Sequence, residues 1–274
     1  FVVRISMGEE ELVLLDVEGE VATITLNRPK RGNALTQAMM VQMIDILEKV
    51  RKDERVHVVV LTGNGKYFCT GMDLGGAAQK DLGDDMDKEE DGTIGRGLKF
   101  FQGLHRFPKP VIGKINGSCF GGGVGLLFCC DFRIVSSEAT LCFSEVKRGI
   151  APALISHIIL PQGNTFQMKQ YMLSGERFSA QEAERLGLLT AVVPPQELNN
   201  EVTKVAKSLL SSAPQAMATI KHMCQFAEGH TEEENEKNVK RIFKEMMGSE
   251  EAFHGISSFA AKQKPDWTQF RAKL

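Results

Sequence analysis

Short apolar segments that alternate with helical patterns constrain the fold of this chain more than any other feature. Residues 11–26 contain two apolar runs separated by Glu18-Gly19-Glu20, which predicts a β-hairpin. Apolar residues then recur at helical spacing from Thr36 to Val50, and the mainly apolar residues 56–62 predict a buried strand. The order strand, strand, helix, strand predicts a parallel sheet with a crossover helix, and therefore an α/β fold.

The same alternation returns further along the chain. Residues 110–115 and 132–135 are predicted strands on either side of a glycine-rich helix start at 121–130, and a helix at 180–186 precedes a strand at 188–193. Everything after Glu197 has a helical pattern, in segments 202–210, 213–227, 232–247 and 250–262. We therefore expect a catalytic core over residues 1–196 and a C-terminal helical region over residues 197–274. The acidic, glycine-containing segment 75–97 predicts a mobile loop.

Composition excludes several classes of function. The formal net charge of -2 provides no basic field for nucleic acid. No apolar run approaches the roughly 18 residues of a membrane-spanning helix. The six cysteines form no CxxC pair and the six histidines no HExxH motif, so we expect a reduced compartment and no metal site.

Five local motifs follow one another in a recognisable order. They are Asn27-Arg28-Pro29-Lys30-Arg31-Gly32-Asn33-Ala34-Leu35, residues 65–74, Asn116 to Gly123, Phe143 to Pro152, and Leu173 to Ala180. With these motifs the chain resembles the enoyl-CoA hydratase/isomerase (crotonase) superfamily over nearly its whole length. The resemblance implies a ββα spiral core with a C-terminal helical layer. It also implies an acyl-CoA thioester substrate, with coenzyme A as part of that substrate and no separate cofactor.

The triple glycine is the first of two motifs that carry chemistry. Glycines that open a helix let backbone N–H groups approach a ligand oxygen, and the helix N-terminus adds partial positive charge. Gly122 N–H is therefore the first expected donor of an oxyanion hole. By the resemblance, the second donor is Thr70 N–H, in a turn that continues through Gly71, Met72 and Asp73. We expect Asp73 to fix the backbone of this turn rather than to react.

Glu145 is the expected general acid/base, because the resemblance places this carboxylate opposite the substrate's α and γ carbons. Apolar and glycine neighbours should raise its pKa toward the range useful for proton exchange. Typical hydratases of the family carry a second glutamate where this chain has Gly125. If that missing partner limits the reaction, Gly125→Glu should raise hydratase activity.

The subfamily indications diverge. A single carboxylate suits a Δ3,Δ2-enoyl-CoA isomerase, in which one base moves a proton between two carbons. Residues 129–133 and 141–153, however, resemble the methylglutaconyl-CoA hydratase-like branch most closely, which favours hydration or dehydration of a branched enoyl-CoA. A protein of another class, which binds CoA thioesters without turnover, is the third hypothesis.

Several further residues acquire roles from the resemblance. Arg28, Lys30 and Arg31 match positions that contact the phosphates and adenine of coenzyme A, with ordinary surface charge as the alternative. Phe259 and Lys262 match a helix that reaches the coenzyme from the same or an adjacent subunit, within a homotrimer or hexamer. We interpret His157 as a buried structural histidine rather than as a wall of the acyl pocket.

The chain ends in Ala272-Lys273-Leu274, which differs from the peroxisomal Ser-Lys-Leu signal by one hydroxyl group. This tripeptide predicts the peroxisome or a related organelle. The mitochondrion is the alternative, because the sequence begins at Phe1 and a presequence could precede it.

Overall fold

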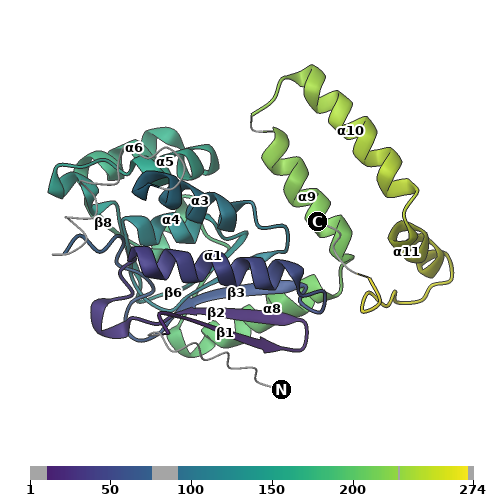
Figure 1. The fold of residues 1–274 in the computed structure, drawn as a ribbon, viewed down its shortest axis with the longest axis horizontal. Helices are drawn as coiled ribbons and strands as arrows, with labels where there is room; N and C mark the ends of the chain where they lie inside the picture. The colour runs from purple at the N-terminus through teal and green to yellow at the C-terminus, as the bar shows by residue number, and fades with distance from the viewer. Residues whose placement is uncertain (1–10, 76–91, 228, 271–274) are drawn as a thin grey trace.

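The computed structural model describes residues 11–75, 92–227 and 229–270. Its centre is a six-stranded sheet in which β1 and β2 form the antiparallel hairpin and all later neighbours run parallel. The strands, in their order across the sheet, are β1 (Val13–Glu18), β2 (Val21–Leu26), β3 (Val58–Gly63), β4 (Val111–Ile115), β6 (Phe132–Ser136) and β9 (Ala191–Val193) (Figure 1).

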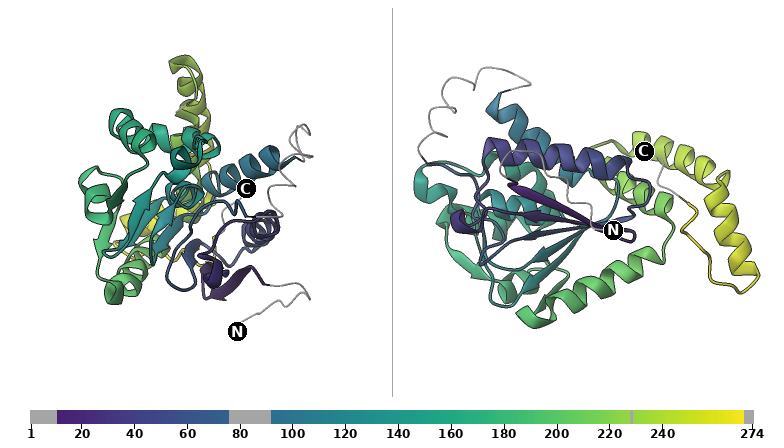
Figure 2. Two further views of the ribbon diagram at one scale, coloured as in Figure 1. Left: turned by 90° about the vertical axis from the view of Figure 1, so that its left-hand side faces the viewer. Right: turned by 60° about the horizontal axis from the view of Figure 1, so that its bottom comes forward.

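Helices bury both faces of this sheet at β3, which explains why that strand is buried along its whole length without alternation. On one face, Val59 and Leu61 of β3 belong to the main core, together with residues of α1 (Gln37–Lys52), α3 (Thr93–His105), α4 (Gly122–Phe128) and α5 (Ala153–Ile159). On the other face, Val58 and Val60 pack with α8 (Leu198–Leu210). Figure 2 shows α1 and α8 on opposite sides of the fan of strands.

A second sheet of three short strands lies beside the main sheet and carries part of the site. Strand β7 (Thr140–Cys142) pairs in parallel with β5 (Cys119–Phe120) and antiparallel with β8 (Arg177–Ser179). The remaining elements of the core are η1 (Pro29–Arg31), η2 (Ser144–Arg148), η3 (Leu160–Gln162), α6 (Thr165–Ser174), α7 (Ala180–Arg185) and η4 (Pro195–Glu197).

Three helices extend beyond the sheet: α9 (Pro214–Ala227), α10 (Glu232–Met247) and α11 (Glu250–Ala260) (Figure 1). They expose large apolar side chains, among them Ile220, Val239, Phe243, Met247, Phe253, Ile256 and Phe259. No helix in the described parts of the chain combines the length and the apolar character that a membrane crossing requires.

The structure confirms the predicted α/β sheet, the hairpin and the four C-terminal helices, with small differences at their ends. Helix α8, which lies in the C-terminal helical region expected from residue 197, packs against the second face of the sheet. The predicted loop 75–97 lies mostly outside the described residues, but its last part, from Thr93, is helical. Helices α3, α5 and α6 and the small sheet were not predicted.

Candidate active site

A cleft of about 380 Å³ opens where the motifs predicted to carry chemistry meet. It lies between the turn that follows β3, the start of α4, the helix η2 and the end of the small sheet. Its lining residues are Ala34, Thr70, Gly71, Met72, Asp73, Leu74, Phe120, Gly121, Gly122, Cys142, Ser144, Glu145, Arg148, Ile150 and Arg177. The fold thus brings the predicted Thr70–Asp73 turn, Gly122 and Glu145 to one place.

The two backbone segments of the cleft touch at Gly71 and Gly122. A β-carbon on Gly71 would lie 2.7 Å from the Phe120 oxygen and 3.2 Å from the Gly122 nitrogen. The φ angle of Gly71 is +91°, a conformation that side chains also disfavour. Glycine at position 71 is therefore required by both space and backbone conformation.

The backbone N–H groups at this contact are not equally free. Thr70 N–H donates to the Gly32 carbonyl at 3.0 Å, so the expected role of Thr70 as an oxyanion donor is wrong. Within the described residues, neither Met72 N–H nor Gly122 N–H has an acceptor. Met72 pairs with Leu35 in a parallel bridge that uses the Gly71 carbonyl and the Asp73 N–H. Since peptide groups alternate along an extended segment, Met72 N–H points away from Leu35.

Glu145 lies on η2, with its carboxylate against Gly121. A β-carbon on Gly121 would stand 3.1 Å from Glu145 Oε1, and Gly121 has a φ of +51°. Glu145 Oε2 is buried and has no hydrogen-bond partner within the described structure. Burial raises the pKa of Glu145, while a backbone hydrogen bond and the nearby Arg148 guanidinium oppose this rise. Such a group can exchange protons closer to neutral pH than an exposed glutamate.

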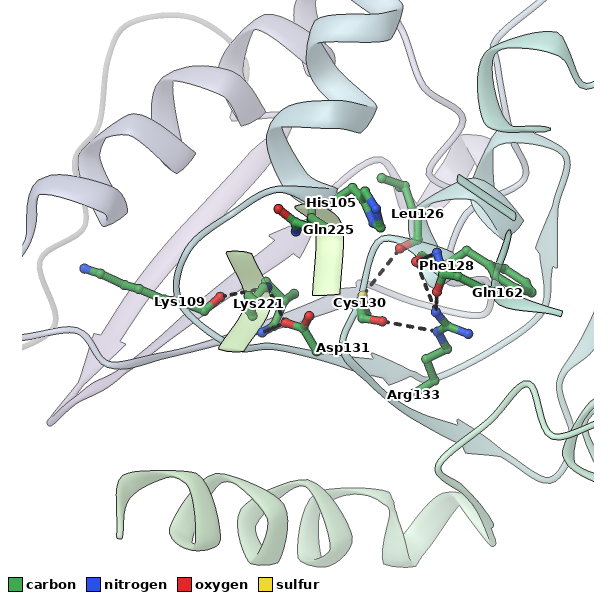
Figure 3. A network of polar contacts seen from close by, with 11 residues as sticks. His105, Lys109, Leu126, Phe128, Cys130, Asp131, Arg133, Gln162, Lys221 and Gln225 are labelled. Carbon is green, nitrogen blue, oxygen red and sulfur yellow. Dashed lines mark hydrogen bonds and ion pairs between the residues drawn. The ribbon is translucent and has the colours of Figure 1, made fainter. Parts of the chain in front are cut away.

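The C-terminal end of α4 is held by a polar network that the sequence did not indicate (Figure 3). Arg133 donates to the carbonyls of Phe128 at 3.1 Å and Cys130 at 3.2 Å, and its guanidinium lies 4.5 Å from the centre of the Phe128 ring. Gln162 also donates to the Phe128 carbonyl, at 3.2 Å. A cation at a helix C-terminus stabilises the helix dipole, whose positive end here is at Gly122.

The position of the missing second carboxylate is filled by neighbouring side chains. A β-carbon on Gly125 would lie 2.3 Å from Ile155 Cγ2 and 3.0 Å from the Phe101 ring. Phe101 and Ile155 are both buried in the main core. A side chain at this position would have to displace Ile155 or Phe101, so the gain of hydratase activity expected for Gly125→Glu requires this packing to rearrange and stays a prediction.

One of the three cations expected to contact coenzyme A, Arg28, has partners within this chain. Arg28 forms an ion pair with Asp73 at 3.1 Å and donates to the Ala34 carbonyl, so it fixes the turn beside the cleft. Asp73 also accepts from Gly75 N–H at 3.2 Å, in line with its expected structural role. Lys30 and Arg31 are exposed on η1.

The structure does not bring the C-terminal residues of the resemblance to this cleft. Phe259 is 85% exposed on α11, and the exposed Lys262 follows that helix. His157 is exposed as well, so its interpretation as a buried histidine is wrong. Over the described ranges, no group of three potential metal ligands is assembled.

The chain is similar in sequence and in fold to several known proteins. A family model described as enoyl-CoA hydratase/isomerase matches residues 16–271. An enoyl-CoA hydratase of Alternaria alternata is 34% identical over 238 residues, which cover 86% of this chain and 77% of that protein. A crotonyl-CoA hydratase of Syntrophomonas wolfei is 36% identical over 213 residues, which cover 77% of this chain and 80% of that protein. The crystal structure of an enoyl-CoA hydratase from Shewanella pealeana superimposes with a TM-score of 0.86, at 29% identity, over 93% of this chain and 96% of that one.

Proposed function

The chain belongs to the enoyl-CoA hydratase/isomerase family, and on that premise we propose that it hydrates an enoyl-CoA thioester, or dehydrates the corresponding hydroxyacyl-CoA, with Glu145 as its acid/base. The observation that carries this proposal is that the buried Oε2 of Glu145 and the N–H of Gly122 share one cleft and have no hydrogen-bond partner among the described residues. The relatives named hydratases support hydration as the general reaction.

The two free backbone N–H groups would hold the thioester carbonyl oxygen. We assign these donors to Gly122 and to Met72, which replaces Thr70. Negative charge collects on this oxygen as the thioester becomes enolate-like, and a single preorganised donor of this kind contributes about 2.7 to 4 kcal/mol to the transition state. The positive end of α4 adds to the same effect.

Glu145 then carries out the proton transfers. As water attacks Cβ of the enoyl group, the Glu145 carboxylate accepts a proton from that water, and the same carboxyl group returns a proton to Cα. The net change is the addition of one water across the double bond. One carboxylate is sufficient for both transfers because they occur in sequence at neighbouring carbons.

The packing around Gly125 favours a second candidate, Δ3,Δ2 double-bond isomerisation. Ile155 and Phe101 fill the space that a second carboxylate would need, and isomerisation needs only one base. In this reaction Glu145 would take a proton from one carbon and return it two carbons away. A third candidate, binding without turnover, does not account for a buried carboxylate without a partner.

Mass spectrometry of the products, combined with the absorbance of the conjugated thioester, separates the three candidates, because isomerisation changes the absorbance and not the mass. The protein is incubated with a 2-enoyl-CoA and, separately, with its 3-enoyl isomer. Hydration adds the mass of one water to the 2-enoyl ester, and this is the expected result. Conversion of the 3-enoyl ester to the 2-enoyl ester without mass change would establish isomerisation instead, and two unchanged esters would support binding alone.

We also propose an oligomeric state and a cellular compartment for the protein. The exposed apolar side chains of α9–α11 favour a homotrimer or hexamer, in which Phe259 and Lys262 would approach the coenzyme bound by an adjacent subunit. Lys30 and Arg31 would contact its phosphates, and no separate cofactor is required. The proposed peroxisomal address rests on Ala272-Lys273-Leu274, which lie outside the described residues, and the mitochondrion remains the alternative.

A further inference from the structure

Two arginines border the cleft on the side of Glu145. Arg148 follows Glu145 by three residues on η2, and residues three apart in a 3-10 helix project from the same face. Arg177 lies directly opposite Cys142 in the small sheet, and Cys142 lies opposite Phe120. Side chains of directly paired residues project from the same face of a sheet. Both arginines line the cleft as a result.

Within the described chain, no acidic side chain forms an ion pair with Arg148 or Arg177, although the Arg148 guanidinium interacts electrostatically with Glu145. Arg148 donates to the Ser144 carbonyl at 3.0 Å, and the Arg177 guanidinium lies 5.1 Å from the centre of the Phe120 ring. Of the two carboxylates in the cleft lining, Asp73 is already paired with Arg28. The other, Glu145, forms no ion pair with either arginine within the described residues, and burial raises its pKa.

The position of the arginines indicates which part of a thioester they would face. If Glu145 acts on the carbons next to the thioester carbonyl, a cation on the same face of the same short helix faces the acyl group beyond them. One turn of a 3-10 helix rises about 6 Å, which corresponds to a few carbon–carbon bonds past the reacting carbons. The cations expected for the coenzyme phosphates, Lys30 and Arg31, are on η1, which the Gly32–Thr70 contact joins to the other wall of the cleft.

Building on the function proposed above, we propose that Arg148 and Arg177 form a carboxylate-binding subsite, and that the substrate is a short acyl-CoA whose acyl chain ends in a second carboxylate. Guanidinium groups suit this ligand because their fixed N–H donors match the two carboxylate oxygens. A purely hydrocarbon acyl chain would leave both cations beside apolar substrate.

Binding of saturated esters tests this proposal without any turnover. Adipyl-CoA and hexanoyl-CoA have the same chain length and differ at the end of the acyl chain, and their affinities are measured by isothermal titration calorimetry. We expect adipyl-CoA to bind at least about tenfold more tightly, the effect of one charged hydrogen bond. Arg148→Met and Arg177→Met should each reduce this affinity ratio toward one. Arg106→Met, which removes an exposed arginine outside the cleft, should retain it.

Three results would overturn the proposal. The first is equal affinity of the wild-type protein for both esters. The second is an affinity ratio between adipyl-CoA and hexanoyl-CoA that stays at the wild-type value in both Arg148→Met and Arg177→Met. The third is a loss of affinity for unesterified coenzyme A in Arg148→Met as large as the loss for adipyl-CoA, which would assign the arginines to a coenzyme phosphate. Arg148→Lys is the control for misfolding. It keeps the positive charge, so its affinity ratio between adipyl-CoA and hexanoyl-CoA should stay above one. Because neither ester can be hydrated, a failure of the proposed reaction would leave this result unaffected.

Discussion

Gly71 packs against Gly122 so closely that a β-carbon on Gly71 would stand 3.2 Å from the Gly122 nitrogen. This contact joins the turn after β3 to the first residue of α4, and it sets the spacing of the two backbone donors assigned to the thioester oxygen. The catalytic geometry therefore depends on the absence of a side chain at position 71.

The first prediction concerns that contact. Gly71→Ala should reduce kcat by about 10²- to 10³-fold, the effect of losing one oxyanion donor. The added methyl group must displace Phe120 or Gly122, and alanine is strained at a φ of +91°. Steady-state kinetics provides the measurement.

Gly103→Ala is the matched control for this substitution. Gly103 lies within α3, and a β-carbon there would meet no atom within 4 Å. Alanine should stabilise that helix by roughly 0.5 to 1 kcal/mol and leave kcat unchanged. Wild-type turnover in Gly71→Ala would show that the contact does not position the donors.

The second prediction follows from the buried carboxyl group. Because burial raises the pKa of Glu145 above its ordinary 4.5, folding favours the protonated form. This contribution to stability is present below pH 4.5 and is lost as the pH rises through the folded-state pKa. Glu145→Gln has no ionisable group at this site and should melt at a higher temperature than the wild type at neutral pH.

Thermal melts across a range of pH check this sign. The difference in melting temperature between Glu145→Gln and the wild type should shrink as the pH falls toward 4.5. A difference that grows on acidification would mean that the folded protein favours the ionised form. Glu138→Gln on the loop between β6 and β7 serves as the control for loss of a glutamate outside the cleft.

The third prediction concerns Arg133, which lies at the opposite end of α4 from the proposed oxyanion donor. Arg133→Met should lower the free energy of unfolding by roughly 2 to 4 kcal/mol, because the Phe128 and Cys130 carbonyls lose charged donors. If Arg133 also positions Gly122, kcat should fall while the affinity for unesterified coenzyme A stays the same. An equal loss of kcat and of affinity for unesterified coenzyme A would indicate general unfolding. Arg133→Lys should recover part of the turnover.

The fourth prediction tests the assembly. Phe243 is 60% exposed on α10, and Phe253 is 75% exposed on α11. If these side chains pack against neighbouring subunits, Phe243→Asp should shift the protein from trimer or hexamer to monomer in sedimentation velocity. A wild-type protein that sediments as a monomer at micromolar concentration would contradict the proposed assembly.

Local sequence patterns were sufficient for the parts of the fold whose signal is local. Mainly apolar segments indicated β3 and β4, because a strand covered on both faces needs no polar side. Strands β5, β7 and β8 contain only two or three residues each, so no period could emerge from them. Helix α3 was missed because its glycines, such as Gly97 and Gly103, weaken a helical pattern.

The sequence predicted which residues form the site, but not their hydrogen bonds or their packing. Glu145 and Gly122 stand in distinctive motifs, and the fold brings both to the cleft. Which N–H is free in the Thr70–Asp73 turn depends on Gly32, nearly forty positions earlier, whose carbonyl accepts from Thr70. Likewise, the lack of a carboxylate at Gly125 was visible in the sequence, but the packing of Ile155 against this position was not.

We propose that Glu145 transfers the protons of the reaction. The most direct test is the turnover of Glu145→Gln on an enoyl-CoA that the wild type converts, followed by loss of the conjugated thioester absorbance. The amide keeps the shape of the side chain but cannot accept and return a proton, so kcat should fall by about 10²- to 10⁴-fold, with the affinity for the ester nearly unchanged. A Glu145→Gln variant that turns over at the wild-type rate would show that Glu145 does not transfer the protons.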